Sequence, residues 1–312
     1  MKIASLEIKN PFVLAPLAGY TDLPFRLLCR EYGAGLVCSE MISSHGLAYQ
    51  QQKTFDMIKT TAAEQPVSMQ LFGSEAKIMG EAAAILSEYP VDIIDINMGC
   101  PVKKVIKKGA GAALMKNPRL AGEIISSVCR NSSKPVTVKI RIGWNHQEKN
   151  GVEFAKMAED NGAQAIVVHA RTWTDGFSGE IDPDMIRKIK KAVNVAVIGN
   201  GDIINYQQGL DMIKKTGCDG VMIGRAALGC PWVFQNRNPD VSLNFRLQAL
   251  NRHLELIKTY GTPDWGLAGI KNHSGKYFKG LPHGSAVRQK IYRTETFKQL
   301  QELIDNLTGM QH

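Results

Sequence analysis

The 312-residue chain lacks every pattern by which cysteine and histidine usually bind zinc. Its cysteines form no CxxC pair and no Cys/His spacing suited to a metal; they are Cys29, Cys38, Cys100, Cys129, Cys218 and Cys230. We therefore predict no metal, and we expect most of these cysteines to be small buried side chains in a reducing compartment.

Long apolar runs are also missing. None approaches the roughly 18 residues that indicate a membrane span. The first ten residues, MKIASLEIKN, carry charges where a signal peptide has its apolar stretch. A hydrophobic content of 44% and a charged content of 21% are typical of a globular protein. We expect a cytoplasmic protein with no membrane partner, and nothing in the sequence indicates an obligate protein partner.

The sequence has neither a Rossmann glycine fingerprint nor a Walker loop, which argues against a tightly held dinucleotide or ATP. Positive charge, by contrast, is in excess, with a net charge of +9. Residues 241–312 hold ten Lys/Arg against five Asp/Glu and so contribute +5 of that total. This bias favours a polyanionic partner.

The first 240 residues repeat one pattern eight times: a short β-rich run, a turn with Gly, Asn or Pro, and a longer amphipathic stretch. The β-rich runs begin at Phe12, Leu36, Pro66, Ile93, Val136, Ala165, Val195 and Gly220. Eight strand–helix units in about 240 residues predict a (β/α)8 TIM barrel over residues 1–240, with a doubly wound sheet as the weaker alternative.

From about residue 243 the strand rhythm stops and apolar residues follow helical spacing, which predicts a small helical bundle over residues 241–312. These residues are Leu247, Leu250, Leu254 and Ile257, then Phe297, Leu300, Ile304 and Leu307. Breaks are expected at 261–263 and 280–284. Between them, IKNHSGKYFKG mixes lysines with aromatics, a composition that suits RNA, although Tyr277 and Phe278 suit a core equally well.

Period-two alternation places polar side chains inside the predicted barrel. In the fifth run Val136, Val138 and Ile140 share the helix-facing side, so Lys139 points inward. The inward residues expected to converge near the strand ends are Gln70, Asn97, Lys139, His169 and Asn200. One inward polar residue is ordinary barrel filling, and His169 alone would fit either a structural or a functional role. Five together, one a lysine that needs an anionic partner, indicate a ligand site at the mouth.

The last two strands end in loops typical of a phosphate site. Gly199-Asn200-Gly201-Asp202 and Ile223-Gly224-Arg225 combine glycines, which let backbone N–H groups approach an anion, with a guanidinium that can pair with phosphate oxygens. Lys139 would lie at the other end of the ligand. A flavin fits, because a fixed ammonium stabilises the negative charge of the reduced ring and Gln70 can bond its pyrimidine edge.

Eight segments in this order resemble the tRNA-dihydrouridine synthases, most closely their bacterial B-type branch. They are APLAGYTDLPFR, MQLFG, DINMGCPVKKV, GAGAALM, VTVKIRIGW, VVHART, GNGDI and IGRAALGCPW, and they span essentially the first 235 residues. NMGCP and the VKIR–HART pair are specific, whereas GNGDI and IGR recur in other flavin barrels.

The resemblance implies an enzyme that binds FMN, takes a hydride from NADPH and reduces the C5=C6 bond of particular uridines in tRNA. It implies that Cys100 is the proton donor and that the helical domain helps to bind the tRNA. The residues that it implies for FMN are Pro16, Leu17, Ala18, Gln70, Lys139, His169, Asn200, Gly201, Asp202, Gly224 and Arg225.

The chemistry supports Cys100 independently. Hydride addition to C6 leaves enolate-like charge at C5, and a thiol of ordinary pKa, about 8.5, is protonated near neutral pH and can serve as the acid. The lysines after Cys100 suggest a mobile basic loop, hinged by glycine, that closes over a phosphate-rich substrate. The side chains that we expect to contact the RNA are Asn97, Lys103, Lys104, Arg141, Arg171 and Lys271.

Three side chains, Trp173, Asp175 and Asn272, depart from the family pattern, which puts the RNA contacts and the choice of uridine in doubt. Two other functions stay open: an FMN-dependent reductase of a free pyrimidine, similar to dihydroorotate or dihydropyrimidine dehydrogenases, and a non-catalytic tRNA-binding protein. The basic helical tail and the lysine loop argue against the first, and the presence of Cys100, Lys139 and His169 argues against the second, because binding alone requires no proton donor.

Overall fold

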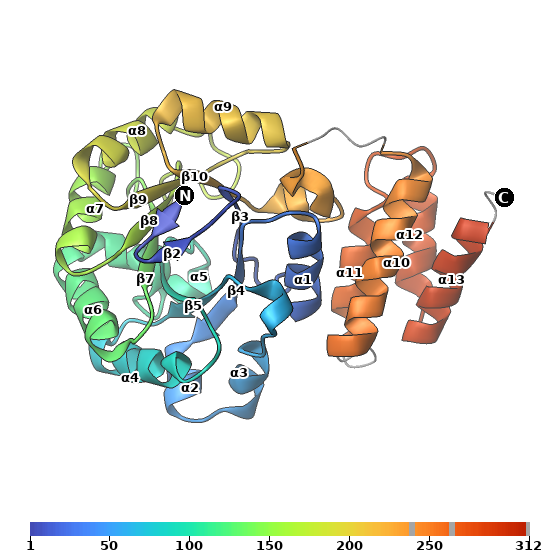
Figure 1. Cartoon of the computed structure of the whole chain (residues 1–312), viewed down its shortest axis with the longest axis horizontal. Helices are drawn as coiled ribbons and strands as arrows, with labels where there is room; N and C mark the ends of the chain where they lie inside the picture. The colour runs from blue at the N-terminus through green and yellow to red at the C-terminus, as the bar shows by residue number, and fades with distance from the viewer. Residues whose placement is uncertain (237–240, 262–265, 310–312) are drawn as a thin grey trace.

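All eight predicted strands are present and form one closed parallel barrel (Figure 1). The structure is a computed structural model that describes residues 1–236, 241–261 and 266–309. The barrel strands are β3 (Phe12–Leu14), β4 (Leu36–Ser43), β5 (Val67–Phe72), β6 (Ile93–Met98), β7 (Val136–Arg141), β8 (Ala165–His169), β9 (Ala196–Asn200) and β10 (Gly220–Ile223). β10 pairs with β3 and closes the ring, which confirms the TIM barrel and excludes the doubly wound sheet.

Helices follow the strands and surround the barrel. They are α1 (Leu23–Glu31), α2 (Ser44–Ala48), α3 (Gln52–Met57), α4 (Ala76–Ser87), α5 (Lys103–Ile106), α6 (Pro118–Asn131), α7 (Gly151–Asp160), α8 (Pro183–Ala192) and α9 (Tyr206–Thr216). Short 3-10 turns are η1 (Ala62–Glu64), η2 (Gly111–Lys116), η3 (Arg225–Ala227) and η4 (Pro231–Phe234). α6 and α8 begin alike, with a proline in the first turn and an Asn117 or Asp182 side chain that accepts a backbone N–H.

Two apolar layers result from the alternation along the strands. Val136, Val138 and Ile140 of β7 are buried against the helices, as predicted. A second cluster fills the barrel itself and includes Ile93, Val167, Ile198 and Met222. Apolar residues of the strands occupy these two layers. The inward positions near the C-terminal strand ends are occupied by polar residues.

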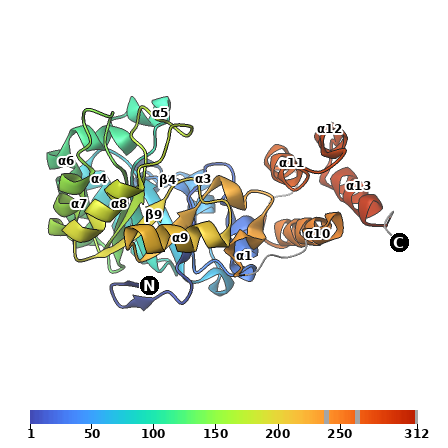
Figure 2. The same ribbon diagram turned by 90° about the horizontal axis from the view of Figure 1, so that it is seen from above.

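A short antiparallel hairpin precedes the barrel and was not predicted. β1 (Lys2–Ile3) pairs with β2 (Leu6–Glu7), and Ile3 and Ile8 are buried against the inner cluster. Figure 2 shows this hairpin at the opposite end of the barrel from α5. The hairpin therefore closes the N-terminal end of the barrel and leaves the C-terminal ends of the strands for a site.

The predicted helical bundle is also present, beside the barrel (Figures 1 and 2). Its helices are α10 (Leu243–Tyr260), α11 (Leu267–Lys276), α12 (Gly284–Arg293) and α13 (Phe297–Gly309). Of the apolar residues predicted to face its core, seven are buried and Leu307 is half-buried. Tyr277 and Phe278 are buried too, so these two rings belong to the core and are not free to stack on RNA.

The bundle docks on the barrel through α1. Arg252 of α10 forms an ion pair with Glu31, with a distance of 2.6 Å between Nη2 and Oε1. His273 of α11 lies 4.6 Å from the Phe25 ring, centroid to centroid, and its Nε2 is 3.0 Å from the carbonyl oxygen of Tyr20. The predicted boundary between residues 240 and 241 stays a prediction, because 237–240 lie outside the described residues, as do two residues of the predicted break at 261–263.

Candidate active site

Neighbouring strands bring the predicted inward residues to one end of the barrel. In the sheet register Gln70 is opposite Asp95, Asn97 is opposite Lys139, and His169 is opposite Asn200. The parallel register therefore places polar side chains from five consecutive strands, β5 to β9, side by side. The sequence-based expectation that they converge agrees with this arrangement, and their individual roles stay predictions.

Cys100 lies just beyond β6, where its backbone is held tightly. Its N–H donates to Asn97 Oδ1 at 2.9 Å, and its carbonyl oxygen accepts from the Ala112 N–H at 3.1 Å. Gly111 has φ +63°, and a Cβ there would lie 2.8 Å from the Cys100 carbonyl oxygen. Only glycine permits this close return of the chain. The GAGAA segment thus packs directly against the cysteine.

Burial sets the protonation state of the Cys100 thiol. It raises the pKa of the thiol above its ordinary value, and the opposing influences of the Val102 N–H and of Arg141 are smaller. The side chain is half-buried, so a ligand in the mouth can reach it. Cys100 therefore carries its proton at neutral pH, as an acid must and as a resting nucleophile would not.

Lys139 is a cation with a neutral partner. Its Nζ donates to Asn200 Oδ1 at 3.2 Å, while Asn200 Nδ2 donates to the Met222 carbonyl oxygen at 2.7 Å. Burial, helped by Arg141, lowers the pKa of Lys139 to about 8, against the attraction of Asp95. An enclosed ammonium with further N–H groups to donate fits a ligand that presents acceptor atoms or negative charge.

His169 is neutral in this setting. Burial lowers the pKa of His169 well below its ordinary value, and the cations Lys139, Arg141, Arg171 and Arg225 lower it further. The imidazole is therefore a hydrogen-bonding group, with one donor and one acceptor nitrogen, and does not act as an acid at neutral pH.

The predicted phosphate end is organised by Asp202. Its carboxylate accepts from Arg171 through both oxygens, at 3.0 and 2.5 Å, and from Arg225 Nη2 at 2.9 Å. These bonds, led by that from Arg171, lower the pKa of Asp202. Arg225 is 60% exposed in its side chain and can turn to an anion, so the loop suits a phosphate.

Residues 16–18 of the β3–α1 loop lie beside the exit of β10. A Cβ on Gly224 would be 3.6 Å from Ala15 Cβ and 3.7 Å from Leu17 Cδ2. The Leu17 N–H bonds to Thr21 Oγ1 at 3.0 Å, which shapes the turn. The first and last barrel strands thus place the predicted Pro16–Ala18 and Gly224–Arg225 segments next to each other.

Three residues predicted to contact RNA are engaged within the protein. Arg141 donates to the Gly99 and Thr172 carbonyl oxygens, and Arg171 uses its Nε on Gly179 besides its pair with Asp202. Lys271 donates to the Tyr292 and Thr294 carbonyl oxygens at the end of α12. Each has a structural function that the sequence did not reveal, and RNA contact stays a prediction for all three.

The basic segment after Cys100 is partly helical. α5 and η2 lie within the expected basic loop, and Val105 of α5 is buried. Its four lysines, Lys103, Lys104, Lys107 and Lys108, are exposed, and Gly109 has φ +72°. The charged surface predicted beside Cys100 is therefore present, whereas its mobility stays a prediction.

Trp173 supports the cysteine segment from the β8 side. Its indole stacks on Trp144 with 4.1 Å between centroids, and its Nε1–H donates to the Pro101 carbonyl oxygen at 3.3 Å. Asp175 accepts from the N–H and hydroxyl of Thr172 and from His146. Trp173 and Asp175 thus hold the segments that follow β6 and β8, and their departure from the family pattern stays a prediction.

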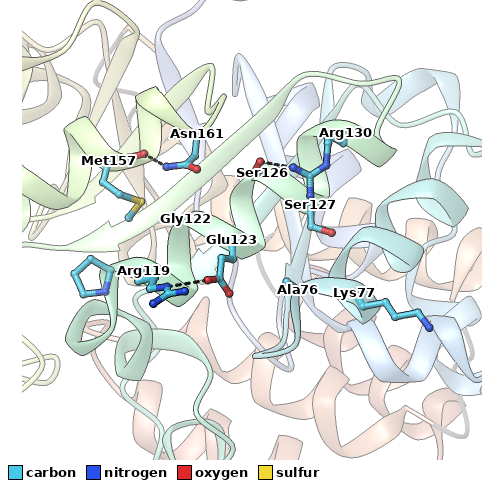
Figure 3. Close-up of a pocket in the computed structure, with 11 residues that line it drawn as sticks. Ala76, Lys77, Arg119, Gly122, Glu123, Ser126, Ser127, Arg130, Met157 and Asn161 are labelled. Atoms are coloured by element: carbon cyan, nitrogen blue, oxygen red, sulfur yellow. Dashed lines mark hydrogen bonds and ion pairs between the residues drawn. The ribbon is translucent and has the colours of Figure 1, made fainter.

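A second depression lies outside the barrel, between α4, α6 and α7 (Figure 3). It measures about 690 Å³ and contains none of the predicted site residues. Polar groups along it pair with each other, as Arg119 does with Glu123 and Arg130 with Ser126. We see no chemistry in this depression that competes with the barrel mouth.

Within residues 1–236, 241–261 and 266–309, no three His, Cys, Asp or Glu side chains gather where they could hold a metal ion. In the same part of the chain, no helix has the length and apolar character to cross a membrane.

A closed parallel barrel whose strand ends bring together a protonated thiol, an enclosed ammonium and an arginine-bearing loop defines a (β/α)8-barrel enzyme. The chain belongs to the dihydrouridine synthase family, whose model, described as "Dihydrouridine synthase (Dus)", matches residues 13–310.

Relatives named for one activity match nearly the whole chain. The "tRNA-dihydrouridine synthase B" of Pseudomonas syringae pv. tomato is 38% identical over 304 residues, which cover 95% of this chain and 90% of the relative. The protein of that name from Vibrio vulnificus is 37% identical, with 93% and 92% covered. A "probable tRNA-dihydrouridine synthase" of Rickettsia bellii is 36% identical, again with 93% and 92% covered.

Solved structures share the fold. The amine oxidase HisD of Pseudomonas geniculata N1 superposes with a TM-score of 0.58 at 16% identity, over 75% of this chain and 47% of that longer one. The old yellow enzyme homologue of Zymomonas mobilis gives 0.52 at 14% identity, over 77% and 96%. At such identities the likeness concerns the barrel alone.

Proposed function

We propose that the protein is a tRNA-dihydrouridine synthase that reduces the C5=C6 bond of specific uridines, with FMN as cofactor and NADPH as reductant. The observation that carries the proposal is a protonated Cys100 beside the enclosed Lys139 at the mouth of a barrel of this family. The proposed tRNA substrate agrees with a cytoplasmic location and with the excess of positive charge.

The residues present fit a flavin phosphate. Arg225 and the Asn200–Asp202 loop would hold the phosphate, and Lys139, Gln70 and Asn97 would meet the polar edge of the ring. When bound, FMN supplies the hydride that NADPH donates. His169, being neutral, would add one hydrogen bond without adding charge.

Proton delivery is the work of Cys100. A hydride at C6 of the uracil leaves negative charge at C5 and O4, so the thiol gives its proton to C5 and takes another from solvent afterwards. Lys139 places positive charge near the reacting groups. The exposed lysines after Cys100 would bind the phosphates of a tRNA whose target uridine has turned out of its stack.

The experiment begins with the purified protein and its absorption spectrum. A bound flavin, followed by NADPH-dependent formation of dihydrouridine in tRNA from cells that lack this gene product, would support the proposal. Turnover of free uracil but not of tRNA would favour a reductase of small pyrimidines. A protein that binds tRNA but contains no flavin would favour the alternative of a non-catalytic tRNA-binding protein.

A further inference from the structure

A line of hydrogen bonds joins Cys100 to Asp95, an inward carboxyl to which the sequence assigned no role at the site. Asn97 Oδ1 accepts from the Cys100 and Gly99 N–H groups, at 2.9 and 3.2 Å. Asn97 Nδ2 is 2.7 Å from Gln70 Oε1, and Gln70 Nε2 is 2.6 Å from Asp95 Oδ2. The other oxygen of Asp95 accepts from Thr137 Oγ1 at 2.5 Å.

The direction of every bond in this line follows from its first one. A backbone N–H can only donate, so the Asn97 atom beside Cys100 must be the oxygen, and its amide nitrogen must then donate to Gln70. The Gln70 atom that it meets must be the oxygen, so the Gln70 nitrogen points at Asp95. The hydrogen-bond directions do not depend on the charge of Asp95, because a carboxyl can accept this bond whether it is ionised or protonated.

Burial makes the line costly to break. Gln70, Asp95 and Asn97 are all at least 94% buried. Burial also raises the pKa of Asp95, against the hydrogen bonds from Gln70 and Thr137 and the charge of Lys139. A protonated Asp95 could donate to Thr137 and still accept from Gln70, so the arrangement survives a change of its charge.

We propose that Asp95 is a positioning residue of the active site: as the terminal acceptor it holds Gln70 in the orientation that Asn97 requires, and through Gln70 and Asn97 it steadies the backbone that carries the Cys100 thiol. The role of Asp95 in catalysis rests on the proposed function, whereas the hydrogen bonds themselves do not depend on it. Without an acceptor at position 95, only the bond from Asn97 holds the Gln70 amide, so Gln70 can move and Asn97 loses a firmly held partner.

Three variants separate this role from general packing. Asp95→Ala removes the acceptor. Asp95→Asn keeps one, because its oxygen can accept from Gln70 while its nitrogen donates to Thr137. Ser68→Ala is the matched control, since Ser68 is another buried inward polar side chain, two residues before Gln70 on β5.

The first measurement is amide hydrogen exchange of a peptide covering residues 97–105 in the purified flavin-loaded enzyme. Asp95→Ala should speed exchange at Gly99 and Cys100 by about tenfold, as expected for one lost buried hydrogen bond. Asp95→Asn and Ser68→Ala should stay within about twofold of wild type. Alkylation of the Cys100 thiol should speed up in the same order.

The second measurement separates the two half-reactions. In Asp95→Ala, reduction of bound flavin by NADPH should stay near wild type while kcat for uridine reduction falls at least about tenfold. Asp95→Asn should largely restore it. Should Asp95→Ala fail to fold, Asp95→Thr, which favours a strand but has a shorter polar arm, carries the same expectation.

Unchanged exchange at Cys100 in Asp95→Ala would overturn the proposal. It would also be wrong if Asp95→Asn were as impaired as Asp95→Ala, because the charge and not the acceptor would then matter. Failure of the proposed function would look different: wild-type protein would not reduce uridine, while the exchange differences would remain.

Discussion

At the scale of single residues, the site depends on two side chains, Cys100 and Lys139, whose pKa values are shifted by burial. Burial raises the pKa of the Cys100 thiol, which therefore stays protonated, and lowers the pKa of Lys139 to about 8. The first makes an acid at neutral pH, and the second makes an ammonium that gains from a negatively charged ligand. Each direction leads to a test.

Cys100→Ala removes the acid and leaves the cofactor residues in place. We expect it to keep its flavin and the reduction of that flavin by NADPH, while uridine reduction falls by about 10²- to 10⁴-fold. Stopped-flow absorbance measures the first step, and dihydrouridine analysis of unmodified tRNA measures the second. Wild-type turnover by the variant would disprove the assignment. Because the acid form is active and the pKa is raised, wild-type activity should decline only in alkaline solution.

Lys139→Met exchanges an enclosed ammonium for an apolar chain of similar length. Flavin binding should weaken. The flavin-free variant should nevertheless be more stable near pH 7, on the order of 2 kcal/mol in free energy of unfolding, because wild type buries a charge there. The pKa falls to about 8 from 10.5, so wild-type stability rises with pH across that window, as the native protein sheds a proton that the unfolded chain retains.

Urea unfolding of flavin-free protein across this pH range measures the difference, with Lys77→Met as the control because Lys77 is exposed on α4. Equal pH dependence in wild type and Lys139→Met would contradict the enclosed position of Lys139. Unaltered affinity for flavin would contradict its place in the cofactor site.

At the scale of elements, the barrel presents Cys100 by packing one segment against another. β6 delivers the cysteine, and the chain returns through η2 so closely that position 111 has room for hydrogen alone. Trp173, from the segment after β8, supports Pro101 from another side. The strand, the 3-10 turn and the indole pair therefore act together on the same few backbone atoms.

Gly111→Ala tests this close approach. Its Cβ would meet the Cys100 carbonyl oxygen at 2.8 Å, and φ of +63° adds roughly 1 kcal/mol of strain for any other residue. We expect the cysteine segment to shift and kcat for uridine reduction to fall at least about tenfold, with flavin content unchanged. Gly176→Ala is the control, since its φ is +57° but its Cβ position is open. Both variants place alanine at a positive φ, and only Gly111→Ala adds the clash, so equal activity of the two would show that the close approach to Cys100 does not control uridine reduction.

At the scale of the whole molecule, the helical bundle is tied to the loop that precedes α1. His273 Nε2–H donates to the Tyr20 carbonyl oxygen and the imidazole packs on Phe25, while His253 lies 4.9 Å from His273, centroid to centroid. Tyr20 follows the Pro16–Ala18 segment by two residues. The proposed tRNA-binding bundle and the proposed cofactor loop thus share a buried contact.

This contact should make the protein sensitive to acid. Burial lowers the pKa of His273 to about 4 from 6.5, so between these values the unfolded chain binds a proton that the native protein does not. Stability therefore decreases as the pH is lowered through this window, by up to about 3 kcal/mol from His273. His273→Gln, which can still bond Tyr20 but does not titrate, should flatten the fall in urea midpoint, whereas exposed His45→Gln should not. If the urea midpoint of His273→Gln depended on pH as steeply as that of wild type, His273 would not be the source of the acid sensitivity.

The sequence by itself determined the eight strands, the faces of the bundle helices and the place of Cys100 at a strand exit, because period two, period 3.6 and turn residues are local properties. Only the tertiary structure decided the rest. The internal hydrogen bonds of Arg141 and Arg171 and the bonds that link Gln70 to Asp95 and Asn97 join residues far apart in the chain, whereas the β1–β2 hairpin is local but has only two residues in each strand. Side-chain hydrogen bonds depend on register between strands, and no periodicity within one strand specifies its neighbour.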